Sequence, residues 1–166
     1  MNAPKPESPV DPVSAPANGL LPWMVCGLGG LFVSYGYFLR IAPSVMAPEL
    51  MRDFGVGAAM LGNLSAIYFF TYALLQVPGG MMLDRFGPRR VLTAAIALCA
   101  LATALFAVSD GTAWAYAGRS LVGASSAFSL VGALKLVSIW FPPRRFALAA
   151  GLSSALGTVG GIMGQA

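Results

Sequence analysis

Residues 80–90 read Gly80-Met81-Met82-Leu83-Asp84-Arg85-Phe86-Gly87-Pro88-Arg89-Arg90, a short charged turn between two long apolar runs. The runs on either side, at about residues 58–83 and 91–108, contain no charged residue. About 20 consecutive apolar residues are enough for a helix to cross the hydrocarbon core of a bilayer. The turn is therefore expected to join two membrane-spanning helices on one side of a membrane.

Three further apolar runs extend this pattern along the chain. Hydrophobic residues make up 57% of the 166-residue chain and charged residues only 10%, against about 25% charged residues in soluble domains. A soluble fold of this size leaves much of its surface exposed and could not bury so much apolar area. The sequence predicts an all-α integral membrane protein with five transmembrane helices, at about residues 20–47, 58–83, 91–108, 112–140 and 146–166.

The two ends of the chain differ in character. Residues 1–19 contain five prolines, which prevent a regular helix, and they offer little to bury, so we expect a disordered tail. The fifth apolar run is still in progress at Ala166. Because a helix normally ends with a cap or a polar turn, the chain is expected to be part of a longer protein.

Charges in the connecting segments indicate the orientation. The segments at 84–90 and 141–145 carry five arginines and one aspartate, whereas those at 48–57 and 109–111 carry one arginine and three acids. Arginine-rich loops stay on the cytoplasmic side, which predicts a cytoplasmic N-terminal tail and a multi-pass protein of the cell inner (plasma) membrane. Arginines beside anionic lipid headgroups account for much of the net charge of +4, so the lipid bilayer, and no nucleic acid, is the expected partner.

The composition also excludes several kinds of catalytic site. The chain has no histidine, which removes histidine metal sites and Ser-His-Asp triads. Its two cysteines, Cys26 and Cys99, lie inside apolar runs without CxxC spacing and are expected to fill space in the core. No cofactor, no metal and no enzymatic activity are therefore expected.

Three charged residues interrupt the apolar runs: Arg40, Arg119 and Lys135. A charge inside a membrane is costly and usually faces a bundle interior or a watery cavity. Arg40 and Arg119 each lie about seven residues, or ~10 Å, from the same membrane face, which favours a pair that binds an anion. Lys135 points about 160° away from Arg119 on an ideal helix. For all three, snorkelling to the interface is the alternative, and the arginines could instead pair with acids elsewhere in the protein.

Polar and aromatic residues fall on shared helix faces near these charges. Tyr68, Tyr72 and Gln76 recur every four residues, and Tyr37 lies close to Arg40. Such stripes are typical of a substrate-binding surface, although ordinary helix packing explains them equally well. Pro43 cannot donate a backbone hydrogen bond, so the carbonyl of Leu39, beside Arg40, is expected to lack its helical partner.

The turn at 80–90 resembles the signature G-x-x-x-D-R-x-G-R-R/K of the major facilitator superfamily, which lies between helices two and three on the cytoplasmic side. Pro88 replaces one basic position of that signature. In that family the charged residues form a gate latch. The resemblance therefore implies a gating motif made of Gly80, Asp84, Arg85, Gly87, Arg89 and Arg90.

Two further segments resemble the same family. Arg119 followed by Gly123 is similar to its helix-four motif, and Tyr37-Phe38-Leu39-Arg40 is similar to helix one of its organic-anion branches, in which the arginine contacts the anion. The overall pattern is also similar to its dipeptide-type branch. The resemblance implies helices one to five of the N-terminal half of a twelve-helix fold, whose remaining helices would be partners. Together with the intramembrane charges and the polar stripe described above, it gives the expected substrate-binding residues: Tyr37, Arg40, Tyr68, Tyr72, Gln76, Arg119 and Lys135.

The resulting expectation is a secondary active transporter of a small organic anion, working by alternating access and coupled to protons in symport. Two other classes fit parts of the sequence. A small helical membrane protein could self-associate through its abundant glycines. A membrane-embedded lipid-headgroup transferase is suggested by Asp110-Gly111, but the spacing to the next arginine fails and no second pair of acids follows.

Overall fold

The computed structural model describes residues 19–109 and 111–165 of the chain. Five of its helices are long and apolar enough to cross a membrane. The predicted disordered tail at 1–19 lies outside the described residues except for Gly19, as do Asp110 and Ala166. In chain order the helices are α1 (Leu20–Val45), α2 (Ala47–Phe54), α3 (Ala58–Phe86), α4 (Pro88–Ala107), α5 (Thr112–Trp140) and α6 (Pro143–Met163).

The turn between α3 and α4 is a single residue. Gly87 has a φ of 80°, in the left-handed region that glycine adopts without steric penalty. Pro88 occupies the first turn of α4, where its missing N–H is not needed. The charged residues expected in a loop at 84–90 therefore belong to the ends of two helices, which fixes where their side chains point.

Between α1 and α3 the structure differs from the expected loop. Residues 47–54 form the short helix α2, with no buried residue. Its apolar residues follow helical spacing, Pro48 lies in its first turn and Gly55, with a φ of 61°, ends it. We expected a loop because the segment is short and charged; the proline, the glycine and the amphipathic spacing were signals of a helix.

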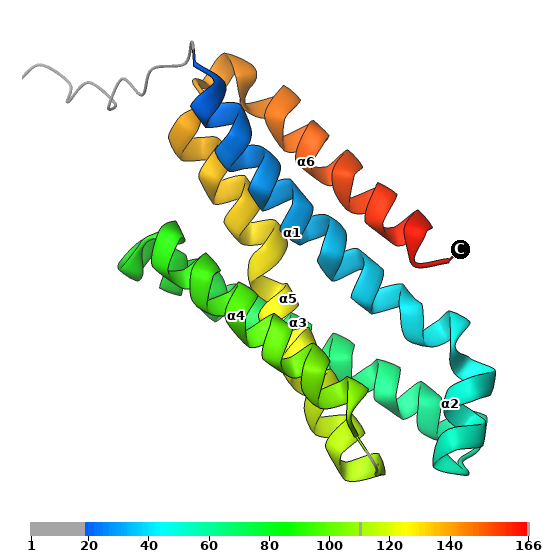
Figure 1. The fold of residues 1–166 in the computed structure, drawn as a ribbon. Coiled ribbons are helices and arrows are strands. Elements are labelled where there is room, and N and C mark those ends of the chain that lie inside the picture. Colours follow the sequence, from blue (N-terminus) through cyan, green and yellow to red (C-terminus); the bar gives the residue numbers. More distant parts are fainter. Residues whose placement is uncertain (1–18, 110, 166) are drawn as a thin grey trace, which may run out of the picture.

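The central helix is α5, which packs against α1, α3, α4 and α6. Figure 1 shows α1 (blue to cyan) running beside α6 (orange to red), with α5 (yellow) crossing toward the green α4. Most of the buried residues of α5 are small, including Ala115, Ser125, Ala127 and Gly132. Small side chains let neighbouring backbones approach closely, which is how helices associate in a membrane. The charged residue buried on α5 is thus held at the centre of the bundle.

Glycines bring α1 and α6 together. A Cβ atom added at Gly160 would collide with the backbone of Ser34, and one at Gly157 would lie 2.8 Å from a Val33 methyl group. Ser34 also donates its hydroxyl hydrogen to the carbonyl of Leu156, at 2.6 Å. The two helices therefore pack backbone against backbone at this crossing.

Gly160→Ala is expected to destabilise the bundle by about 1–3 kcal/mol, the usual range for overpacking a tight contact. The colliding atoms belong to the backbone of α1, which cannot turn aside as a side chain can. The matched control is Gly151→Ala on the same helix, where an added Cβ meets nothing within 4 Å. Unfolding in SDS, followed by circular dichroism, measures both variants. Equal midpoints would contradict the tight packing.

Candidate functional site

Arg119 on α5 is the buried charge at the centre of the structure, with only 3% of its surface exposed. Its Nη1 donates a hydrogen bond of 2.8 Å to the carbonyl of Leu39 on α1. This is the carbonyl that Pro43 deprives of its helical donor, because proline has no N–H to give to the residue four positions before it. A proline in α1 and an arginine in α5 are thus complementary across the bundle.

Aromatic rings form the rest of the surroundings of Arg119. Its guanidinium lies 4.8 Å from the ring centre of Tyr68 and 5.9 Å from that of Phe106. The approach of α5 to α3 requires Gly123, because an added Cβ there would collide with the Tyr68 carbonyl and the Thr71 hydroxyl. The Arg119–Gly123 spacing therefore has a physical basis, since the glycine brings Tyr68 within reach of the arginine.

Arg119 has more hydrogen-bonding capacity than the described residues use. Its Nε is buried and has no hydrogen-bond partner. Neither Arg119 nor Arg40 takes part in the ion pairs found among the described residues. A buried guanidinium without a counter-anion is unfavourable. The arrangement therefore has capacity for an additional anionic group.

Arg40 lies against the same aromatic group from α1. Its guanidinium stands 4.5 Å from the ring centre of Phe69 and 5.8 Å from that of Tyr37. On α3, Tyr68 stacks on Tyr72 with ring centres 6.2 Å apart. Gln76 donates a hydrogen bond of 3.1 Å to the hydroxyl of Tyr72. Tyr68, Tyr72 and Gln76, which recur every four residues in the sequence, are thus in contact with one another along α3.

These contacts group two arginines, Arg40 and Arg119, with three tyrosines, Tyr37, Tyr68 and Tyr72. We call this group the arginine–tyrosine cluster. Phe69 and Phe106 also belong to this environment and were missed, because nothing in an apolar run marks which aromatic ring faces a charge. Six of the seven predicted substrate-binding residues fall in or beside it: Tyr37, Arg40, Tyr68, Tyr72, Gln76 and Arg119.

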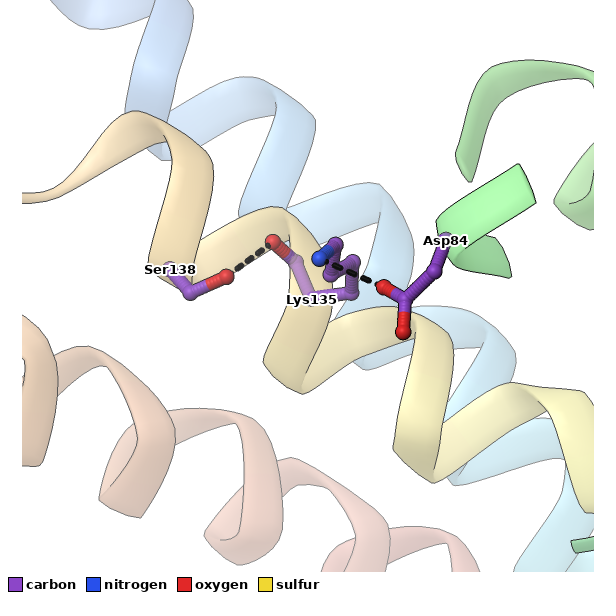
Figure 2. A network of polar contacts seen from close by, with 3 residues as sticks. All are labelled: Asp84, Lys135 and Ser138. Atoms are coloured by element: carbon purple, nitrogen blue, oxygen red, sulfur yellow. Dashed lines mark hydrogen bonds and ion pairs between the residues drawn. The ribbon is translucent and has the colours of Figure 1, made fainter. Parts of the chain in front are cut away.

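Lys135, the seventh, lies elsewhere. Its Nζ is 2.7 Å from Oδ1 of Asp84, which is on α3. Figure 2 shows the lysine side chain reaching from α5 toward Asp84, with Ser138 bonded to the carbonyl of Lys135. The side chains of Lys135 and Asp84 are 37% and 67% exposed. The structure thus joins Lys135 to the gating motif by an ion pair between α3 and α5.

The other gating-motif residues make different contacts. Arg85 stacks on the ring of Phe86, at 5.5 Å from its centre, and the Arg89 carbonyl accepts a hydrogen bond from Thr93. Arg90 is exposed. At Gly80, an added Cβ would only reach ordinary van der Waals contact with Val131. The neighbouring Gly79 is the tight position, since a Cβ there would lie 3.2 Å from Phe128.

A cavity of about 650 Å³ lies between α2 and the adjoining ends of α1, α4 and α5. We call it the α2 cavity. Arg119 and Phe106 line it, together with Leu50, Asp53 and Phe54 of α2. Within the described ranges, no three His, Cys, Asp or Glu side chains are grouped so as to hold a metal ion, and Cys26 and Cys99 are free thiols.

Together, five helices that are long and apolar enough to cross a membrane, with a buried arginine among them, define a multi-pass membrane protein. The sequence profile of the Major Facilitator Superfamily matches residues 25–166. The chain belongs to this superfamily of membrane transporters, as its gating and helix-four motifs had indicated.

Individual relatives agree with this assignment. The chain is 33% identical to YybO, an uncharacterized transporter of Bacillus subtilis (strain 168), over 86% of this chain and 33% of the relative. It is 32% identical to GudP of Pseudomonas putida, a probable galactarate/D-glucarate transporter, over 69% of this chain and 26% of that relative. It is 26% identical to SauU of Cupriavidus necator, a probable sulfoacetate transporter, over 83% of this chain and 32% of that relative. The chain thus spans about a quarter to a third of the length of these relatives.

A solved structure confirms the expected fold. The crystal structure of a bacterial homolog of the human lysosomal transporter Spinster, inward-facing and occupied, matches with a TM-score of 0.84. Sequence identity is 23%, and the match covers 89% of this chain and 32% of the other. The all-α membrane fold, with five spans that form part of a major facilitator superfamily transporter, is therefore confirmed.

Proposed function

We propose that the chain belongs to a secondary active transporter that moves a small organic anion across the cell inner membrane by alternating access. The observation that carries this proposal is the arginine–tyrosine cluster, in which two guanidinium groups have no ion-pair partner among the described residues. Two relatives support it, since their names refer to galactarate or D-glucarate and to sulfoacetate. Each of these solutes carries at least one anionic group.

The cluster would bind the anion by charge and by aromatic contact. Arg119 offers a buried Nε with no partner, and Arg40 offers a half-buried guanidinium held between Tyr37 and Phe69. Charge-assisted hydrogen bonds between a guanidinium and a carboxylate or sulfonate are the strong, directional kind. Tyr72 and Gln76, already bonded to one another, would contact hydroxyl groups on the body of the solute.

The ion pair between Asp84 and Lys135 would act as a latch on the cytoplasmic side. It joins the cytoplasmic ends of α3 and α5 and would favour the state in which these ends stay together. The cytoplasmic side is assigned from the arginine-rich segments, so the proposal places the N-terminal tail there. Proton-driven symport would supply the energy, with the proton carried by a group outside the described residues.

Arg40→Gln is expected to raise the KM for uptake of the organic anion by about tenfold, the effect of losing one charge-assisted hydrogen bond. The complete gene product, reconstituted in liposomes, would be given a panel of labelled aldarates, sulfonates, dipeptides and neutral sugars with a proton gradient imposed. Arg144→Gln, an exposed arginine at the start of α6, is the matched control. Uptake of neutral sugars alone, or an unchanged KM for the anion, would contradict the proposal.

A further inference from the structure

The short helix α2 is the least anchored helix of the structure. None of its residues is buried. A single residue, Met46, joins it to α1, and the left-handed Gly55 ends it before α3 begins at Ala58. Just before α2, Pro43 interrupts the hydrogen bonding of α1. An element with few buried contacts, flanked by a proline and a glycine, can change position at low free-energy cost.

Beneath α2 lies empty space that reaches Arg119. Leu50 and Phe54 of α2 line the α2 cavity on one side, and Arg119 lines it on another. A second cavity, of about 290 Å³, is lined by Leu50 and Arg119 as well. Moving α2 toward α5 would therefore fill space with its apolar face instead of displacing packed side chains.

The same movement would carry a carboxylate toward the buried guanidinium. Asp53 is the single acid among the described residues that line the α2 cavity. Glu49 does not line it, and Asp84 pairs with Lys135. In the structure Asp53 lies 3.9 Å from Arg52, and these two side chains are 69% and 83% exposed. An ion pair between two exposed side chains contributes little to stability and is easily given up.

We propose that Asp53 is the resident counter-anion of Arg119. In this structure α2 has no buried residue and the Arg119 Nε is unpartnered. In the alternative state α2 settles into the α2 cavity and the Asp53 carboxylate accepts hydrogen bonds from Arg119. In this state the weak, exposed ion pair of Asp53 with Arg52 is replaced by a buried ion pair with Arg119. This replacement favours the alternative state, because a buried arginine without a counter-anion is unfavourable. A solute anion bound at Arg119 would displace Asp53 and release α2.

The consequence for transport rests on the proposed function. If a solute anion and Asp53 compete for Arg119, the resident carboxylate weakens apparent binding, since part of the protein is occupied by its own acid. Asp53→Asn should then lower the KM for the anion. The pairing itself requires no solute and can be measured without transport, which separates the two proposals.

Disulfide formation across the α2 cavity tests the movement directly. Leu50→Cys on α2 lies one turn from Asp53, and Val122→Cys on α5 lies one turn from Arg119; both positions line the cavity. Cys26 and Cys99 would be replaced by alanine so that only this pair can react. In liposomes without solute, the pair should form a disulfide upon oxidation, because α2 brings the two sulfurs within bonding range.

The charge dependence of that reaction decides the matter. Asp53→Asn should slow disulfide formation by about fivefold or more, a usual lower value for coupling between two sites. Glu49→Gln removes the same charge from the same helix and should change the rate by less than about twofold. A rate that is equal in Asp53→Asn and Glu49→Gln, or a pair that never cross-links, would overturn the proposal. An unchanged KM in Asp53→Asn with a slowed disulfide would leave the pairing intact and refute only the competition.

Discussion

Replacing Arg119 by glutamine is expected to lower anion uptake by at least about a hundredfold, equivalent to about 3 kcal/mol lost from two charge-assisted hydrogen bonds. The side chain is buried, its Nε is unpartnered, and no described carboxylate pairs with it. Glutamine removes the charge, and its shorter side chain does not reach the Leu39 carbonyl that Nη1 of Arg119 contacts. Uptake by the complete gene product, with surface expression measured in parallel, checks the result. Arg144→Gln, an exposed arginine at the start of α6, is the control.

Loss of uptake alone would not distinguish anion binding from a structural role, because Arg119 also supplies the hydrogen bond that Pro43 withholds from Leu39. Pro43→Ala separates the two. Alanine restores a backbone N–H four residues after Leu39, so its carbonyl regains a helical donor. In the Arg119→Gln background, Pro43→Ala should therefore recover stability, measured by SDS unfolding, by about 1 kcal/mol.

Uptake should remain lost in that double variant, because alanine at position 43 restores no positive charge. Recovered uptake would mean that Arg119 serves only to hold α1 and α5 together, and the anion-binding role would be withdrawn. The two readouts thus respond to different properties of one side chain. A further variant, Arg119→Lys, keeps the charge but loses the guanidinium fork and should retain more uptake than glutamine.

The relation between Pro43 and Arg119 also indicates how far the sequence could lead. That Leu39 would lack its helical donor follows from Pro43 alone, since proline always withholds that bond. Its partner could not be predicted, because Arg119 is 80 residues away and the register of α5 against α1 is set by contacts along both helices. The missing backbone donor within α1 could be predicted from the sequence, whereas the contact between residues of two different helices could be found only in the packed structure.

The helices also differ in how well the sequence predicted them. The long helices were predictable because a bilayer demands long apolar segments. The short amphipathic α2 was missed, although Pro48 and Gly55 are ordinary start and stop signals, because a charged segment between two spans was interpreted as a loop. The residue that now links α2 to the site, Asp53, was accordingly treated as a determinant of orientation alone.

Lys135 is a residue whose ion-pair partner could not be predicted from the sequence. Ideal helical geometry places it about 160° around α5 from Arg119, but that geometry does not identify the partner. Asp84 and Lys135 lie near the ends of two helices that the structure shows to be in contact. Knowledge of which helices touch would have been sufficient to pair them.

Asp84→Lys is expected to reduce uptake by at least about tenfold, because it would place two ammonium groups where the structure has an ion pair of 2.7 Å, and juxtaposed like charges are strongly unfavourable. The ends of α3 and α5 that carry Asp84 and Lys135 should separate. Val131→Cys, half-buried beside Gly80 between these helices, should then react faster with a maleimide added from that side of the membrane.

Exchanging the two charges is the decisive arm of this experiment. The double variant Asp84→Lys with Lys135→Asp restores an attractive pair in reversed order, so the Val131→Cys reactivity and much of the uptake should return toward the original values. If Lys135 instead contacts the transported anion, as its sequence position first indicated, Lys135→Asp would repel the solute. The exchange would then restore the reactivity of Val131→Cys without restoring uptake. Failure to restore either property would show that the contact between Asp84 and Lys135 does not hold α3 and α5 together, and the latch would have to be sought among the other arginines of the motif.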